Sequence, residues 1–134
     1  MNKEKLQNIL KDHELWLESE GKEGKKANLS GADLRGLDLS GAYLMGAYLS
    51  RAWLEGANLS ETNLERADLE MANLMGANLF KASLSGANLS ETNLSGVNLR
   101  WANLWKTNLS NVLHNDKTVW PTGFNIENYK NIVD

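Results

Sequence analysis

The sequence has no cysteine, one proline and only two histidines among its 134 residues. Without cysteine, the chain can form neither a disulfide nor a thiolate-bound metal site. The two histidines, His13 and His114, are too few to build a histidine-based metal centre. We therefore expect no metal and no cofactor.

Long apolar runs and an excess of one charge are also missing. No stretch of about 20 apolar residues occurs, so we expect no membrane span. The first 14 residues are charged throughout and lack the apolar segment of a secretion signal. With 14 basic and 17 acidic residues, the net charge of −3 is too mild to indicate a nucleic-acid partner. The expectation is a cytoplasmic protein.

Leucine, in contrast, recurs with strict regularity. It occupies every fifth position from Leu29 to Leu109, which makes 17 consecutive repeats. Alanine stands two positions before the leucine in 12 of them, and the residue between is mostly Asn or Asp. The two positions after each leucine are mostly polar residues or glycine. The pattern spans residues 26–110.

This period excludes two ordinary structures. On a helix, a five-residue step turns about 140° net, so the leucines would point to every side. On a flat strand, an odd period sends successive leucines to opposite faces. The pattern is consistent if the chain bends once per repeat, so that every Ala and Leu points inward. Bends of one hand produce a solenoid in which each coil rests on its neighbours.

The pattern, written A-(D/N)-L-x-x, resembles that of the pentapeptide-repeat proteins. This resemblance implies an all-β solenoid: a right-handed quadrilateral β-helix with 20 residues in each coil and about four coils over residues 26–110. Residues 1–25 resemble the N-terminal helical cap and connector of many bacterial members, with Asn2 capping the helix and Gly21 and Gly24 ending it. Residues 111–134 resemble a C-terminal capping tail, with a short helix from Asn125 and apolar Ile126, Tyr129, Ile132 and Val133. Together the three segments form one structural domain.

Stacked coils place residues 20 apart next to each other, which predicts several surface contacts. Asn58, Asn78 and Asn98 would form an amide ladder. Arg35 would pair with Glu55, and Glu61 with Lys81. Phe80 would lie against Arg100 in a cation–π contact. Buried threonines would need a backbone carbonyl as hydrogen-bond partner.

Large apolar or aromatic side chains at outward positions are the anomaly of the surface. The residues that we single out as a candidate interaction surface are Phe80, Arg100, Trp101, Trp105, Tyr43, Tyr48 and Trp53. Either the terminal caps cover them or another protein chain does. The three early aromatics fall on three successive sides of the shaft. At the other end, the tail is already needed to close the last coil, so we expect an exposed tryptophan and a homodimer through the C-terminal end.

No catalytic arrangement is evident. The corner serines have no neighbouring histidine to act as a base. Acidic side chains at Glu65, Asp68 and Glu70 lie on a convex surface without a cleft. We therefore expect a non-enzymatic scaffold that binds an unidentified protein partner.

Two alternatives remain open. The first is implied by the resemblance, since some family members protect or inhibit DNA gyrase by mimicking a DNA duplex. This chain departs from those members because it is shorter, less acidic and without loop insertions. The second alternative is a purely structural shaft.

Overall fold

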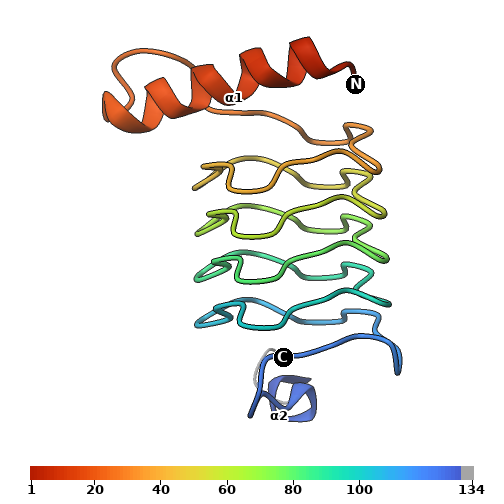
Figure 1. Ribbon diagram of the computed structural model, residues 1–134. Helices are drawn as coiled ribbons and strands as arrows, with labels where there is room; N and C mark the ends of the chain where they lie inside the picture. Colours follow the sequence, from red (N-terminus) through yellow and green to blue (C-terminus); the bar gives the residue numbers. More distant parts are fainter. Residues whose placement is uncertain (131–134) are drawn as a thin grey trace.

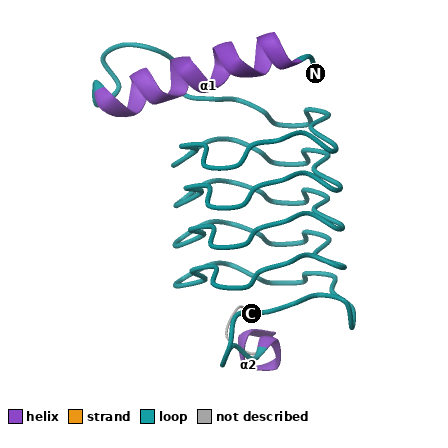
Figure 2. Cartoon of the chain, viewed as in Figure 1, coloured by secondary structure: helices purple, strands orange, loops and turns teal. Residues whose placement is uncertain are grey.

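A computed structural model describes residues 1–130 of the chain. It contains two helices, α1 at Lys3–Glu18 and α2 at Ile126–Lys130. Between them the chain winds into a stack of flat turns, with α1 across one end of the stack and α2 at the other (Figure 1). No named strand occurs in the described residues, and the β-structure consists of single-residue parallel bridges (Figure 2).

The bridges define the register of the stack. They join residues 20 apart, beginning with Asn28 to Tyr48 and Asp33 to Trp53. Each bridge is supported by a backbone hydrogen bond, such as the 2.7 Å bond from Leu29 N–H to the carbonyl of Tyr48. The stacking of residues 20 apart, which the resemblance to the pentapeptide-repeat proteins implies, is therefore confirmed. The last bridge, from Asn98 to Val119, contains one additional residue.

The interior of the stack holds the leucine and alanine columns. Every repeat leucine is buried, and most of them are 0–2% exposed. The threonines that replace alanine are buried as well, and the predicted backbone partners are present. Thr62 and Thr92 donate their hydroxyl hydrogens to the carbonyls of Leu59 and Leu89, at 2.7 and 2.8 Å. The core is thus continuous and leaves no unpaired buried hydroxyl among these threonines.

The corners explain why Asn or Asp precedes the leucine. In 13 repeats its side-chain oxygen accepts the backbone N–H two residues later, which fixes the turn. The predicted amide ladder is largely wrong for this reason. The Asn78 oxygen accepts from the Phe80 N–H at 3.0 Å, and its contact with Asn98 in the next coil is a long 3.5 Å.

Each corner also contains a left-handed residue, the second after the leucine. Glycine fills many of these positions, but nine of them carry a side chain. Most of the nine are charged, and the two bulky apolar ones are Met71 and Trp101, both with φ of 61°. A side chain strains this conformation, because its Cβ crowds the backbone. Trp101 therefore adopts a conformation that glycine would adopt with less strain.

The two ends differ in how they meet the stack. At the start of α1, Asn2 accepts a 2.7 Å hydrogen bond from the Lys5 N–H, as predicted for a capping residue. Leu6 is buried against the first coil, whereas Leu15 is 40% exposed because it lies on the outer side of the helix. At the other end Ile126 is buried. Ile132 and Val133 lie outside the described residues.

Candidate interaction face

The aromatic residues singled out from the sequence differ in their surroundings. Trp101, Trp105 and Tyr43 are the most exposed of them, at 74%, 64% and 59%. Tyr48 and Trp53 are also exposed, but each ring has a cation above it from the same chain. The Lys26 Nζ lies 4.2 Å from the centre of the Tyr48 ring, and the Arg35 guanidinium lies 4.9 Å from that of Trp53.

Arg35 does not pair with Glu55 as the stacking predicted. It donates two hydrogen bonds to the Asp33 carboxylate, at 2.9 and 2.8 Å. The reason is local, since Asp33 stands two residues earlier at the same corner. This pair lowers the pKa of Asp33 to about 2, because the guanidinium stabilises the charged carboxylate. Glu55 instead accepts a hydrogen bond from Asn73.

The predicted contact between Phe80 and Arg100 is also wrong. Lys81 supplies the cation, with its Nζ 5.3 Å from the centre of the Phe80 ring. Lys81 follows Phe80 directly at the corner, whereas Arg100 belongs to the next coil and is exposed. Phe80 itself is half-buried. Of the proposed surface, Phe80, Tyr48 and Trp53 thus have partners within the chain.

Tyr43, Trp101 and Trp105 lie on one side of the shaft, which we call the 43–103 face. Bridges from Tyr43 to Asn63, Asn63 to Ser83 and Ser83 to Asn103 define its middle column. The three outward columns of the face are Gly41, Glu61, Lys81 and Trp101; Tyr43, Asn63, Ser83 and Asn103; and Met45, Glu65, Ser85 and Trp105. Three coil spacings of about 4.8 Å separate its first and last rows, or about 14 Å.

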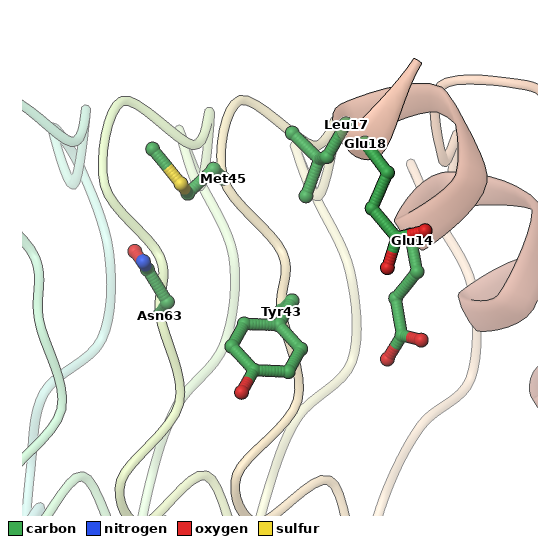
Figure 3. A pocket seen from close by; sticks show the side chains of 6 residues that line it. All are labelled: Glu14, Leu17, Glu18, Tyr43, Met45 and Asn63. Atoms are coloured by element: carbon green, nitrogen blue, oxygen red, sulfur yellow. The ribbon is translucent and has the colours of Figure 1, made fainter. Parts of the chain in front are cut away.

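The first row of the face borders a shallow hollow of about 450 Å³ beside α1. Its lining residues are Glu14, Leu17, Glu18, Tyr43, Met45 and Asn63 (Figure 3). Figure 3 shows the two glutamates extending from the helix on one side and Tyr43 and Met45 coming from the shaft. The hollow therefore has an apolar floor and an acidic rim, and no basic residue lines it.

Three consecutive repeats in the early coils lack the corner hydrogen bond, and the first of them, Tyr43, lines the hollow. Tyr43, Tyr48 and Trp53 occupy the position where 13 other repeats place a bonded Asn or Asp. An aromatic ring cannot replace that side-chain acceptor. The replacement of Asn or Asp by an aromatic residue is visible in the sequence, so an alignment of the repeats could have revealed the missing hydrogen bond. It indicates that exposed rings are favoured at this end of the shaft at the expense of turn stability.

His13 positions α1, a role that could not be inferred from the residue pattern. The side chain is completely buried. Its Nδ1 accepts a 2.9 Å hydrogen bond from the Ala27 N–H, so its Nε2 carries the hydrogen that is donated to the Met45 carbonyl at 2.9 Å. Burial lowers the pKa of the imidazole, because the charged form would lose its hydration. The neutral ring thus joins the helix to the connector and to the shaft beside the hollow.

The described part of the chain holds no group of three or more histidine, cysteine or acidic side chains placed to share a metal ion. Among residues 1–130, no helix combines the length and apolarity needed to cross a membrane. The buried titratable group, His13, uses both ring nitrogens in structural hydrogen bonds. The features that remain for recognition by another molecule are therefore the shape of the surface, its charged side chains and its exposed aromatic rings.

Comparison with known proteins agrees with the repeat geometry. A family model for pentapeptide repeats matches in eight copies over residues 25–60, 42–79, 57–96 and 92–113. Curated proteins give no significant match. Among solved structures, the pentapeptide repeat protein Rfr23 from the cyanobacterium Cyanothece 51142 is 42% identical, with a TM-score of 0.72. The match covers 75% of this chain and 68% of Rfr23.

Two further cyanobacterial structures are similar, both from Nostoc PCC 7120. The pentapeptide repeat protein alr5209 is 28% identical over 92% of this chain and 93% of its own length, with a TM-score of 0.51. HetL, a pentapeptide repeat protein involved in heterocyst differentiation regulation, is 40% identical over 66% of this chain. The match covers 44% of HetL with a TM-score of 0.45. From the matched repeats and the similarity to Rfr23, the chain belongs to the pentapeptide-repeat family.

Proposed function

We propose that this protein is a non-enzymatic scaffold that associates with a second copy of itself through the tryptophans of its C-terminal coil. The scaffold is a right-handed quadrilateral β-helix of about four coils, capped by α1 at one end and by the tail at the other. Family members form such helices and are generally structural or interaction modules. The 20-residue register of the bridges supports the same architecture.

The observation that carries the proposal is the exposure of Trp101 and Trp105. The apolar residues of the tail are used elsewhere. The Trp120 and Phe124 rings stack at 5.1 Å, the Phe124 and Tyr129 rings lie 4.7 Å apart, and Ile126 is buried. The described part of the tail, residues 111–130, thus leaves Trp101 74% and Trp105 64% exposed. Exposed tryptophans are favoured at the centres of protein contacts, since they bury a large area with little loss of side-chain freedom.

The composition of this patch suits contact between identical chains. A two-fold interface must be complementary to itself, because the same residues occur on both sides. Trp101 and Trp105 provide rings, and Arg100 and Lys106 provide cations beside them. The Lys106 Nζ already lies 4.6 Å from the centre of the Trp105 ring. Rings and cations on one patch can pair with their counterparts on a second copy.

A catalytic role has no support in the described residues. The lining of the hollow beside α1 includes Glu14, Glu18 and Tyr43, but no histidine, lysine, serine or threonine. The surface of the stack is otherwise convex, as in other solenoids, and suits binding to another macromolecule.

Sedimentation analysis of the intact chain tests the proposal. We expect wild type to dimerise at micromolar concentrations and the Trp101→Ser, Trp105→Ser double variant to remain monomeric. Trp53→Ser is the matched control, because it removes an exposed tryptophan from the opposite side of the shaft, and it should dimerise like wild type. A monomeric wild type, or a dimeric double variant, contradicts the proposal. Inhibition of gyrase supercoiling by the purified protein would favour the DNA-mimic alternative.

A further inference from the structure

We propose that the two copies lie side by side and antiparallel along the 43–103 face, so that Trp105 of each copy sits at the hollow beside α1 of the other. This inference rests on the proposed self-association. It assigns an occupant to the hollow and a register to the dimer. The register follows from the order of side chains along the face.

The face has four rows, one from each successive coil. Consider a two-fold axis that lies in the plane of the contact, perpendicular to the shaft, midway between the second and third rows of the face. This axis makes the two shafts antiparallel. The first row of one copy then meets the fourth row of the second copy, and the second row meets the third. Each of the three columns then faces the same column of the second copy. Residue pairs across the contact can therefore be read from the three columns.

The charged pair in this register is Glu61 with Lys81 of the second copy. Both residues are exposed, and both are left-handed corner residues in one column. Although they stack in adjacent coils, they form no ion pair with each other, since the ion pair found within residues 1–130 is that of Arg35 and Asp33. The Lys81 Nζ lies 5.3 Å from the centre of the Phe80 ring but has no carboxylate partner in the described residues, so both charges can pair with a second chain. By symmetry, each dimer contains this contact twice.

The apolar rows are complementary in the same register. Trp101 of one copy lies opposite Gly41 of the other, where even an added Cβ would meet no atom within 4 Å. Trp105 lies opposite Met45, which lines the hollow. An open position and a flexible apolar side chain thus meet the two tryptophans.

A parallel arrangement of the same two faces is unfavourable. Its two-fold axis would run along the shaft and exchange the two corner columns. Glu61 would then face Glu65 of the second copy, and like charges in direct opposition weaken association. The hollow would also face another hollow and stay empty of tryptophan. The distribution of charge along the face therefore favours the antiparallel register.

A charge-exchange experiment with the full chain tests this register. In Glu61→Lys two lysines face each other, and in Lys81→Glu two glutamates do, so each variant alone should self-associate roughly tenfold or more weakly than wild type. An equimolar mixture of the two should recover the affinity, because every contact then joins opposite charges. The differences should shrink as salt is raised.

Glu91→Lys serves as the matched control. Glu91 is likewise an exposed left-handed corner residue, with φ of 59° against 57° for Glu61, but it lies on another side of the shaft. It should dimerise like wild type and should not respond to mixing. Recovery only in the mixture supports the register. Unchanged dimerisation of the two single variants, or a mixture that stays weak, overturns the register while leaving self-association through the tryptophans intact. A monomeric wild type would overturn both.

Discussion

The two ends of the shaft use their aromatic residues in opposite ways. At the N-terminal end, Tyr48 and Trp53 lie under cations of the same chain, and the Trp16 ring stacks on His13 at 5.6 Å. At the C-terminal end, Trp101 and Trp105 stand outward and the tail leaves them uncovered. The difference shows that an outward aromatic residue in a repeat does not by itself mark an interface. What distinguishes the two tryptophans is their exposure, 74% and 64% against 50% for Trp53 and 44% for Tyr48, since Trp105 also has a cation, Lys106, beside its ring.

The ends also differ in how they are attached. At the N-terminal end, the Lys25 N–H donates to the Asp12 carbonyl at 3.1 Å and the Ala27 N–H donates to His13. At Gly24 an added Cβ would lie 2.3 Å from the same Asp12 carbonyl, so the connector presses directly against the helix. At the C-terminal end, the Thr118 hydroxyl donates to the Leu94 carbonyl at 2.7 Å, the Leu99 N–H donates to the Val119 carbonyl at 2.7 Å, and the Gly96 N–H donates to the Asn115 side chain at 3.0 Å. The predictions below test whether the two attachments differ in strength.

Removal of the N-terminal segment should have the largest effect. Deleting residues 1–20 exposes Leu29 and Leu34 of the first coil together with its unpaired backbone edge, so we expect aggregation. Among residues 125–129, Ile126 is the one that is buried. Deleting residues 125–134 should therefore lower the melting temperature while leaving the protein soluble. Size-exclusion chromatography compares the two. A soluble monomer lacking residues 1–20 would show that α1 does not protect the first coil.

Substitution of His13 should come next. His13→Ala leaves the Ala27 N–H and the Met45 carbonyl without their partners in a buried site. We expect a loss of about 3 kcal/mol in the free energy of unfolding. His114→Ala is the control at the other end, where the half-buried ring makes an edge contact with Trp120, and it should cost less than about 1 kcal/mol. Chemical denaturation measures both, and equal losses would refute the stronger attachment of α1.

Acid should weaken the N-terminal attachment selectively. The folded-state pKa of His13 is lowered below its ordinary value of 6.5, so the unfolded chain binds the proton more readily. Stability should therefore be complete above pH 6.5 and fall as the pH drops from there through the folded-state pKa. Asp33 acts in a separate window, because its contribution is present above 3.8 and lost as the pH falls through about 2. Thermal melts against pH should show the first slope in wild type and lose it in His13→Gln.

The smallest expected effect is a gain in stability at the C-terminal end. Trp101 holds a φ of 61°, and Trp101→Gly should relieve that strain and stabilise the monomer by about 1 kcal/mol. Trp105 has no positive φ, so Trp105→Gly should bring no such gain. Denaturation of the two variants under monomeric conditions distinguishes them. If Trp101→Gly were the less stable of the two variants, the positive φ of Trp101 would not destabilise the monomer.

Much of the fold could be predicted because one constraint repeats. Every leucine and alanine must point inward, and this requires a bend after each repeat and a solenoid. The number of residues in each coil, 20, came from the resemblance to the family and not from the period. Contacts between side chains were less predictable, because the stacking of the coils sets the backbone register but does not determine which side chains form hydrogen bonds or ion pairs. Arg35 contacts Asp33 and Phe80 contacts Lys81, in each case at the same corner. The asparagines accept a hydrogen bond from the backbone N–H two residues later, as Asn78 does from Phe80.

The candidate site was predictable in part. Trp101, Trp105 and Tyr43 could be singled out as outward aromatics from the period alone. The hollow could not, because it needs Glu14, Leu17 and Glu18, and nothing in the repeat says where α1 lies against the shaft. That position depends on His13, whose two hydrogen bonds reach residues 14 and 32 positions away. A single histidine in a charged helix gives no sign of such a role.

The central claim is that Trp101 and Trp105, and not the other three tryptophans, contact a second copy of the chain. Fluorine NMR of protein labelled with 5-fluorotryptophan tests it in one series, because all five tryptophans report separately and can be assigned by single substitutions. As the protein is concentrated from the low to the high micromolar range, the resonances of Trp101 and Trp105 should shift or broaden. Those of Trp16, Trp53 and Trp120 should stay in place. Five resonances that do not change with concentration, or changes confined to the other three, would contradict the account.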